Sequence, residues 1–231
     1  MSRFTFRVDL AYDGARFEGF ARQPGRVTVE GELVKALSEL VPGLEGVSVG
    51  GRTDRGVSAA RQVISFHCRK GLTPSSIGRA IDEACPGAIS CLEARRAPSW
   101  FHAQHSARWR RYVYLMDDVP DLEVARVDRL LCGLIGRHDF SAYARQTPAG
   151  KSTVRKLLEA RARRSSEGIR FDFKGESFLR RQVRVMVSTA VREALAGADD
   201  DALIQLARTL DRNATEYPAD PRRLVLDRVG Y

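Results

Sequence analysis

The segment 51–57 reads Gly-Arg-Thr-Asp-Arg-Gly-Val and places one carboxylate, Asp54, between two arginines and two glycines. Glycine permits a tight turn or a positive φ angle and lets a ligand approach the backbone closely. The guanidiniums of Arg52 and Arg55 favour the ionised form of Asp54 and attract phosphate groups. The mixture predicts chemistry on an anionic molecule, with Thr53 among the contacts. Taken alone, so short a motif is more often an ordinary surface turn.

The overall charge points to the same class of partner. The chain of 231 residues carries 38 Lys and Arg against 29 Asp and Glu, a formal charge of +9 and a pI near 9.8. Most of the basic residues are arginine, whose planar fork pairs with phosphate and whose flat face stacks on bases. Nucleic acid is therefore the predicted partner class. A protein of merely arginine-rich composition remains the alternative at this point.

The cysteines and the N-terminus bear on the compartment. Four cysteines occur without any C-x-x-C pair, which predicts reduced thiols in a cytoplasmic protein. The first residues lack the apolar core of a signal peptide, and no apolar run approaches the ~18 residues of a membrane span. We expect a cytoplasmic protein with no membrane association.

The hydrophobic pattern predicts an α+β fold in two related halves, 1–105 and 106–231. Each half is expected to be a mostly antiparallel sheet with helices on one face. Strands are expected at 4–12, 45–50, 61–68, 88–94, 107–116, 153–164, 169–174 and 223–229. Helices are expected at 28–40, 73–84, 121–134, 177–196 and 200–210, the first two capped by Thr28 and Thr73.

The expected strand 107–116 alternates in an informative way. Arg108, Arg110, Tyr112 and Tyr114 share one face, since side chains two apart along a strand point the same way. Such a face suits RNA, because arginine contacts the backbone and aromatic rings stack on bases. Alternatively, the tyrosines pack under a helix while the arginines reach solvent. The pattern leaves both interpretations open.

Other candidate features are weaker. On the expected helix 177–196, Arg181, Arg184 and Arg192 share the side opposite the apolar residues, which is typical of a solvated face. The pair His102-x-x-His105 is half of a metal site, and metal sites need three or four ligands. We expect no metal. No phosphate loop and no G-x-G-x-x-G follows a strand, so we expect no nucleotide cofactor.

Five blocks resemble the tRNA pseudouridine synthase A family, in the family's order and over nearly the whole chain. They are Tyr12-Asp13-Gly14 with Gly19-Phe20-x-Arg22-Gln23; Gly51-Arg52-Thr53-Asp54-x-Gly56-Val57; Phe101-His102-Ala103 with Ser106-Ala107 and Arg111-Tyr112-x-Tyr114; Gly136-x-His138-Asp139-Phe140; and Phe178-Leu179-x-x-x-Val183-Arg184.

The resemblance implies the pseudouridine synthase fold, with a basic cleft between the halves, and conversion of uridine to pseudouridine in the tRNA anticodon stem-loop, typically at tRNA positions 38, 39 and 40. It also implies a homodimer that uses no cofactor or metal. By matching position, Asp54 is the catalytic aspartate, Arg52 helps to flip the base, Tyr112 packs on the uracil and Arg184 pairs with the aspartate. Arg55, Arg108 and Arg110 are expected to contact the substrate.

The chain departs from the family pattern at Gln104, where arginine is usual, and at Ser188 and Arg223, where glycine is usual. These departures bear on RNA contacts and leave the catalytic matches intact. Two other functions were weighed: a catalytically silent RNA-binding relative, and a metal-dependent phosphoesterase built on Asp54 with the two histidines. Intact catalytic matches argue against the first, and too few ligands argue against the second.

Overall fold

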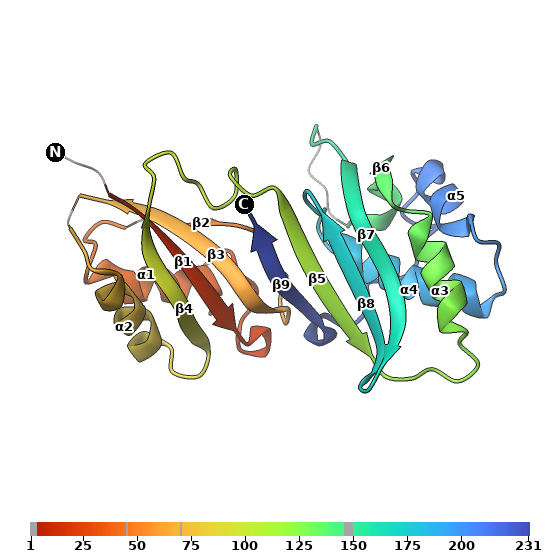
Figure 1. Ribbon diagram of the computed structural model, residues 1–231, viewed down its shortest axis with the longest axis horizontal. Helices are drawn as coiled ribbons and strands as arrows, with labels where there is room; N and C mark the ends of the chain where they lie inside the picture. Colours follow the sequence, from red (N-terminus) through yellow and green to blue (C-terminus); the bar gives the residue numbers. More distant parts are fainter. Residues whose placement is uncertain (1–3, 45, 70, 146–149) are drawn as a thin grey trace. The chain divides into compact units, whose positions relative to one another are not determined.

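The computed structural model describes residues 4–44, 46–69, 71–145 and 150–231 (Figure 1). By its internal contacts the chain divides into two compact units. Unit 1 comprises Met1–Arg110 with Val225–Tyr231, and unit 2 comprises Arg111–Leu224. Each unit is an α+β layer with a mostly antiparallel sheet, as the sequence predicted.

The sheet of unit 1 has the order β4-β1-β3-β9. Strand β1 (Phe4–Tyr12) pairs antiparallel with both β3 (Ser58–Cys68) and β4 (Ile89–Ala97). The two-residue strand β2 (Ser48–Val49) also pairs antiparallel with β3, whereas β9 (Leu224–Gly230) runs parallel to it. The predicted strands are thus present, although β2 is shorter than the expected 45–50, a range that includes the undescribed residue 45.

Two helices, α1 (Val29–Ser38) and α2 (Pro74–Ala84), cover one face of this sheet (Figure 1). Both predicted caps are confirmed: the Oγ1 of Thr28 accepts from the amide of Gly31, and that of Thr73 accepts from the amide of Ser76. Beneath the helices lies a core of fully buried apolar side chains. Its members include Phe6, Val8, Leu10, Leu33, Leu37, Ile64, Ile77 and Ile81.

The last strand differs from the expected division of the chain. The sequence placed 223–229 with the second half, but β9 pairs with β3 through Ser58↔Val225 and Ala59↔Leu226. Strand β9 therefore belongs to the sheet of unit 1, because its backbone forms hydrogen bonds with β3, which is far away in the sequence.

Unit 2 repeats the plan with a sheet of order β5-β8-β7-β6. Its strands are β5 (Trp109–Met116), β6 (Gly136–Asp139), β7 (Val154–Ser165) and β8 (Gly168–Gly175). The predicted hairpin is confirmed as β7 and β8, which pair antiparallel. Strand β6 was not expected; it is short and gains its hydrogen bonds from the edge of β7.

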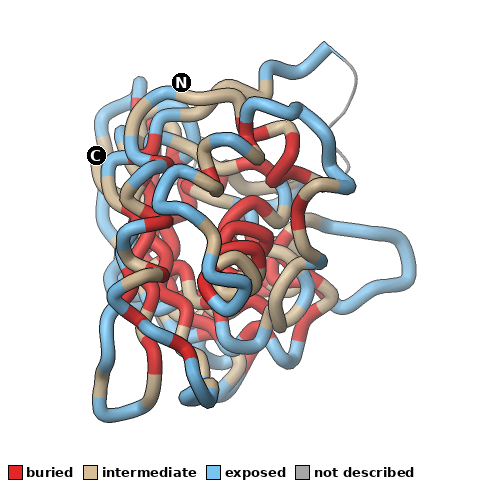
Figure 2. The backbone as a smooth tube through the Cα atoms, turned by 90° about the vertical axis from the view of Figure 1, so that its right-hand side faces the viewer, coloured by how far each residue is buried: buried red, intermediate tan, exposed pale blue. Residues whose placement is uncertain are grey.

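The helices of unit 2 are α3 (Val124–Cys132), α4 (Gln182–Leu195) and α5 (Ala202–Thr209). In Figure 1, α3 and α4 lie against one face of β7 and β8, and burial is greatest where helix and sheet meet (Figure 2). Helix α4 begins five residues later than the expected 177. Arg181 adopts a left-handed conformation with φ 63°, which ends the preceding turn and excludes it from the helical wheel.

In the part of the chain that the structure describes, none of the helices is long and apolar enough to cross a membrane.

A buried carboxylate organises the exposed side of the unit 2 sheet. Asp172 of β8 is 3% exposed and accepts hydrogen bonds from Arg111 (3.1 Å), Arg170 (3.0 Å) and Arg163 (3.4 Å). Burial alone would raise the pKa of this carboxyl. Hydrogen bonds from Arg170, with the charges of Arg170 and Arg111, hold the pKa below its ordinary value instead.

Because this pKa is depressed in the folded state, the Asp172 cluster stabilises the fold above the unfolded-state pKa of about 3.9, and its contribution is lost as the pH falls through the folded pKa. We expect Asp172→Asn to lower the free energy of unfolding at pH 7 by on the order of 3 kcal/mol and to flatten its dependence on pH in the acid range. Denaturant unfolding between pH 3 and 7 measures both effects. Asp200→Asn, which breaks an exposed pair with Arg129, should cost less than about 1 kcal/mol. Equal losses in the two variants would contradict this role.

Candidate active site

Asp54 lies on a loop, residues 51–57, that is fastened to the core by one buried amide. The side chain of Gln62 is fully buried, and its Oε1 accepts from the amide of Gly51 (3.2 Å) while its Nε2 donates to the carbonyl of Gly51 (2.6 Å). Gln62 therefore satisfies both backbone groups of Gly51, as a neighbouring strand would. This places the start of the Asp54 loop at a fixed point on β3.

A second buried bond holds the middle of the same loop. The hydroxyl of Thr53 lies 2.8 Å from that of Tyr12, which also accepts from Gln62 (3.3 Å). Burial raises the pKa of Tyr12 to about 12 in spite of these hydrogen bonds, so the phenol stays neutral. Thr53 is itself buried, at 8% exposure. Its hydroxyl thus serves to anchor the loop, and the expected substrate contact of Thr53 finds no support in its side chain.

The first sequence block packs against the Asp54 loop. The amide of Phe20 donates to the carbonyl of Thr53 (3.1 Å), and Gly14 approaches Val57 so closely that a Cβ atom would lie 2.2 Å from its backbone. Gly19 has φ 104° and lies beside the backbone of residues 53–55. Two motifs that are separate in the sequence therefore form one structural unit around Asp54.

Arg110 has a structural role in place of the expected substrate contact. Its side chain is buried, and it donates to the carbonyls of Gly50 (2.7 Å), Gln104 (2.8 Å) and Ala107 (3.3 Å). These bonds join the residue that precedes the Asp54 loop to the connection 98–107. The guanidinium is directed at carbonyl oxygens because burial without such partners would be costly.

The other arginines predicted in this unit lie at the surface. Arg52 and Arg108 are exposed, and within the described ranges neither forms an ion pair with a carboxylate. Arg55 is also exposed and pairs with Glu18 at 3.2 Å. The surface around the loop thus keeps positive charge that a phosphate could contact.

The tyrosines of strand β5 are packed, as the second interpretation expected, but Arg110 of the same alternating face is buried as well. Tyr112 is 7% exposed and meets Phe178 edge to face, with ring centroids 5.2 Å apart. Tyr114 is 3% exposed and meets Phe171 in the same way at 6.1 Å. The tyrosines are mostly buried, whereas Arg108 at the same face is exposed. The sequence alone could not predict this burial, because alternation shows which side chains share a face and not what covers that face.

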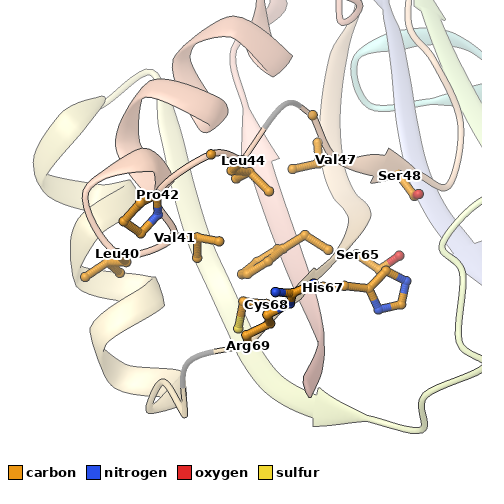
Figure 3. A pocket seen from close by; sticks show the side chains of 13 residues that line it. Leu40, Val41, Pro42, Leu44, Val47, Ser48, Ser65, His67, Cys68 and Arg69 are labelled. Atoms are coloured by element: carbon orange, nitrogen blue, oxygen red, sulfur yellow. The ribbon is translucent and has the colours of Figure 1, made fainter. Parts of the chain in front are cut away.

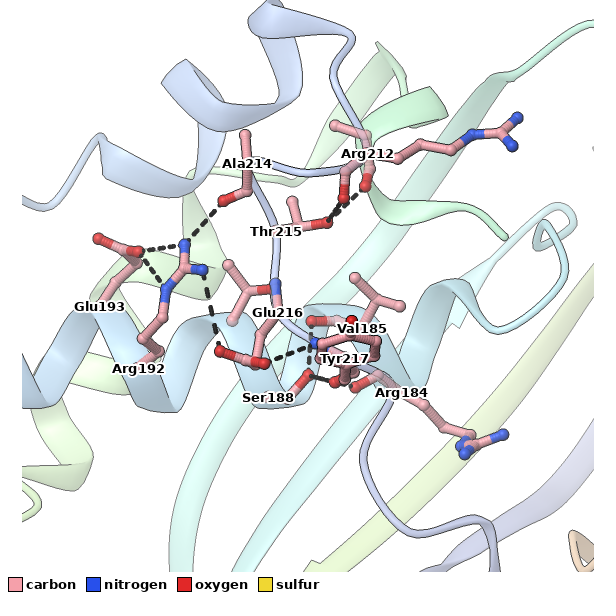
Figure 4. Close-up of polar contacts among 12 residues, drawn as sticks. Arg184, Val185, Ser188, Arg192, Glu193, Arg212, Ala214, Thr215, Glu216 and Tyr217 are labelled. Carbon is pink, nitrogen blue, oxygen red and sulfur yellow. Dashed lines mark hydrogen bonds and ion pairs between the residues drawn. The ribbon is translucent and has the colours of Figure 1, made fainter. Parts of the chain in front are cut away.

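Arg184 lies in the first turn of α4. Its Nε donates to the carbonyl of Ala219 (2.5 Å), and its own carbonyl accepts from the amide of Ala219 (3.2 Å). Figure 4 shows the guanidinium extending beyond the helix. Arg192 likewise donates to the carbonyl of Ala214 (2.8 Å). The expected solvated face is therefore wrong for Arg192, which binds a segment that crosses the helix. Arg184, expected at the catalytic centre, binds the same segment.

Asp54 belongs to unit 1, and Tyr112 and Arg184 belong to unit 2. Sequence reasoning missed Gln62, which holds the loop. The available signal was a glutamine within an apolar strand, opposite Leu10 in the register of β1 and β3 and hence on the core-facing side.

The histidine pair is occupied by local hydrogen bonds. The Nδ1 of His102 accepts from the amides of Gln104 (3.2 Å) and His105 (3.3 Å), and its Nε2 bonds to the hydroxyl of Ser48 (2.9 Å). Burial, with the nearby His105, lowers the pKa of His102. Among the residues described, no group of three or more His, Cys, Asp and Glu is placed to hold a metal ion.

Unit 1 also contains a groove of about 880 Å³ between the segment 40–48 and the end of β3 (Figure 3). Its lining combines apolar side chains, such as Leu40 and Val47, with the polar side chains of Ser65, His67 and Arg69. None of the predicted site residues lines it.

Comparison with known proteins identifies the family of the chain. A family model described as tRNA pseudouridine synthase matches residues 132–231. The tRNA pseudouridine synthase A of Chlorobaculum tepidum is 32% identical over 100% of this chain and 99% of its own. The protein of that name from Lacticaseibacillus casei is 33% identical over 98% of this chain and 99% of its own. A solved Cbf5–Nop10–Gar1 complex contains a more distant match, with 15% identity and a TM-score of 0.40 over 80% of this chain and 44% of that one.

The matches define an RNA-modifying isomerase built from α+β units. The chain belongs to the tRNA pseudouridine synthase A family, since relatives above 30% identity match it from end to end.

The Gln62 contacts yield a prediction about the Asp54 loop. We expect Gln62→Leu to lower the free energy of unfolding by about 1–3 kcal/mol, because both backbone groups of Gly51 lose their partner in a buried place. Hydrogen exchange of the peptide 48–57 should accelerate more than that of β1. Gln23→Leu is the matched control, since the Gln23 amide makes one exposed bond, to the carbonyl of Glu18. Unchanged exchange in 48–57 would exclude Gln62 as the anchor.

Proposed function

We propose that this enzyme isomerises uridine to pseudouridine in the anticodon stem-loop of tRNA, at the family-typical positions 38, 39 and 40, with Asp54 starting the reaction. The observation that carries the proposal is the fastening of Asp54. Its loop is anchored at Gly51 and at Thr53 by buried hydrogen bonds, in a chain that belongs to a pseudouridine synthase family. A carboxylate that acts on a sugar needs such a fixed position.

The chemistry suits a single carboxylate. The N-glycosidic bond breaks, the uracil rotates while it is held, and a carbon–carbon bond forms at C5. Asp54 acts either as nucleophile at the ribose C1′ or as base at C2′ to form a glycal intermediate. The reaction is redox-neutral and rearranges the substrate within itself. By the family resemblance, Tyr112 packs on the uracil and takes the proton from its C5 atom. By the same resemblance, Arg184 pairs with Asp54.

The target base is stacked within RNA, so the enzyme must extrude it at a cost of a few kcal/mol. Arg52 is positioned for this step on the same loop as Asp54, with an exposed guanidinium. Arg108 and Arg55 add phosphate contacts along the surface of unit 1. Such contacts provide much of the affinity and make it dependent on salt.

The proposal extends to the assembly and its compartment. By the family resemblance the enzyme is a homodimer in the cytoplasm, where it meets tRNA, and it works without cofactor or metal. Sedimentation equilibrium at micromolar concentration tests the dimer, and a monomer mass would reject it.

The decisive measurement is tritium release from tRNA labelled at uracil C5. Wild-type enzyme should release tritium from unmodified tRNA, in the presence of EDTA as well as in its absence. Asp54→Asn should abolish release while leaving tRNA affinity nearly unchanged, because the amide keeps the shape but lacks the charge and basicity.

The matched control is Glu39→Gln, which neutralises an exposed carboxylate elsewhere in unit 1 and should release tritium as the wild type does. Absence of release by wild-type enzyme would reject the function. Release that survives Asp54→Asn would reject the catalytic residue, and inhibition by EDTA would favour a metal-dependent reaction.

Arg108 and Arg110 lie two residues apart, but we expect their substitution to affect different properties of the enzyme. Arg108→Ala should raise KM for tRNA and reduce the slope of log Kd against log salt by about 1, with unchanged stability. Arg110→Ala should lower the free energy of unfolding by about 1.5–3 kcal/mol and reduce kcat, because its bonds to Gly50 and Gln104 hold the Asp54 loop. The two roles are misassigned if Arg110→Ala changes the salt slope and leaves stability as it was.

A further inference from the structure

Residues 214–219 of unit 2, here called the strap, run along helix α4 and are bound to it at successive points (Figure 4). Arg192 donates to the carbonyl of Ala214 (2.8 Å), and the amide of Glu216 donates to the hydroxyl of Thr189 (3.1 Å). Arg184 exchanges two hydrogen bonds with Ala219. The strap is therefore a fixed segment, although it contains neither helix nor strand.

One residue of the strap has a fixed backbone and a free ring. The carbonyl of Tyr217 accepts from the hydroxyl of Ser188 (2.5 Å), and its amide donates to the carboxylate of Glu216 (2.8 Å). The side chain of Tyr217 is nevertheless 85% exposed. Because the backbone of Tyr217 is fixed, only two side-chain torsions are restricted when its exposed ring stacks on a flat partner.

The charges around Tyr217 select the partner. Arg145 donates to the carbonyl of Glu216 (3.0 Å) and to the hydroxyl of Thr215 (3.2 Å), so its guanidinium lies beneath the strap. Burial lowers the pKa of Arg145, and the positive charges of Arg212 and Arg181 lower it further. The amide of Arg145 donates to the carbonyl of Arg180 (3.1 Å), and the hydroxyl of Thr215 donates to the carbonyl of Arg212 (3.3 Å). Arg181 and Arg212 therefore belong to segments bound to Arg145 and to the strap.

These guanidiniums differ from most others in unit 2. Arg111, Arg161, Arg164, Arg222 and Arg223 each face a carboxylate. Within the described part of the chain, Arg181 and Arg212 form neither an ion pair nor a side-chain hydrogen bond. The carboxylate of Glu216 is directed at the Tyr217 amide and at Arg192 (3.9 Å). The cluster therefore keeps an uncompensated positive charge, which favours an anion with a flat group attached.

A nucleotide has both parts. We propose that Tyr217, Arg181 and Arg212 form a second contact site for the RNA substrate, in which the ring stacks on an unpaired base and the guanidiniums bind the adjacent phosphates. The site rests on the proposed function, and it lies on a different unit from Asp54. It binds a nucleotide other than the target uridine. Stacking on a tyrosine and binding by arginine are the usual means of holding single-stranded RNA.

The test measures affinity, which needs no turnover. Filter binding of an unmodified tRNA transcript at several salt concentrations gives Kd for each variant. Tyr217→Ala should raise Kd by about fivefold or more, whereas Tyr217→Phe should stay within about twofold, since stacking requires the ring and not the hydroxyl. The double variant Arg181→Ala/Arg212→Ala should reduce the slope of log Kd against log salt by about 1–2.

Arg129→Ala is the charge control: it removes one guanidinium that is already paired with Asp200 and should leave the slope nearly unchanged. Thermal unfolding checks that each variant folds, as expected for side chains in solvent. Wild-type affinity in Tyr217→Ala, equal weakening in Tyr217→Phe, or no tRNA binding by the wild type would overturn the site. Weakened binding by Tyr217→Ala in an enzyme that releases no tritium would instead support the site and reject the proposed reaction.

Discussion

The position of Asp54 depends on one buried side chain, the amide of Gln62, which satisfies both backbone groups of Gly51 from within the core. A loop outside regular structure normally leaves such groups to water. Here they are paired with a fully buried side chain, so displacing the loop would leave the polar amide of Gln62 unsatisfied in the core. Because breaking these hydrogen bonds costs free energy, the loop stays bound to the sheet. The loop that carries Asp54 is thereby fastened to β3, which lies between β1 and β9 in the sheet of unit 1.

Arg110 and Tyr12 extend the same constraint outward. Arg110 bonds Gly50 on one side and Gln104 on the other, and Tyr12 bonds Thr53 from beneath. Unit 2 uses a similar device on helix α4, where polar side chains bind the carbonyls and amides of a strap. In both places buried or half-buried donors replace the missing ladder of a strand. Irregular backbone is held in place because several of its polar groups have a defined partner.

Much of the fold was predictable because local patterns determine it. Thr28 and Thr73 cap their helices as expected, and the expected strands 4–12 and 61–68 are present as β1 and within β3. The predictions that were wrong share a cause. Arg110 was expected to contact RNA and Arg192 to lie in solvent, because periodicity defines a face without saying what covers it. The start of α4 was placed too early because the left-handed Arg181 leaves no mark on hydrophobic spacing.

The sequence by itself determined the α+β class, the capped helices, the motif around Asp54 and membership of a pseudouridine synthase family, since these depend on short-range spacing and on residues in fixed order. Only the tertiary structure decided which polar residues hold the loop and which remain for a ligand. Gln62, Arg110 and Tyr217 acquire their roles from partners that lie from 11 to 60 residues away. Hydrogen bonding over such separations depends on how strands and helices pack, and no local pattern records it.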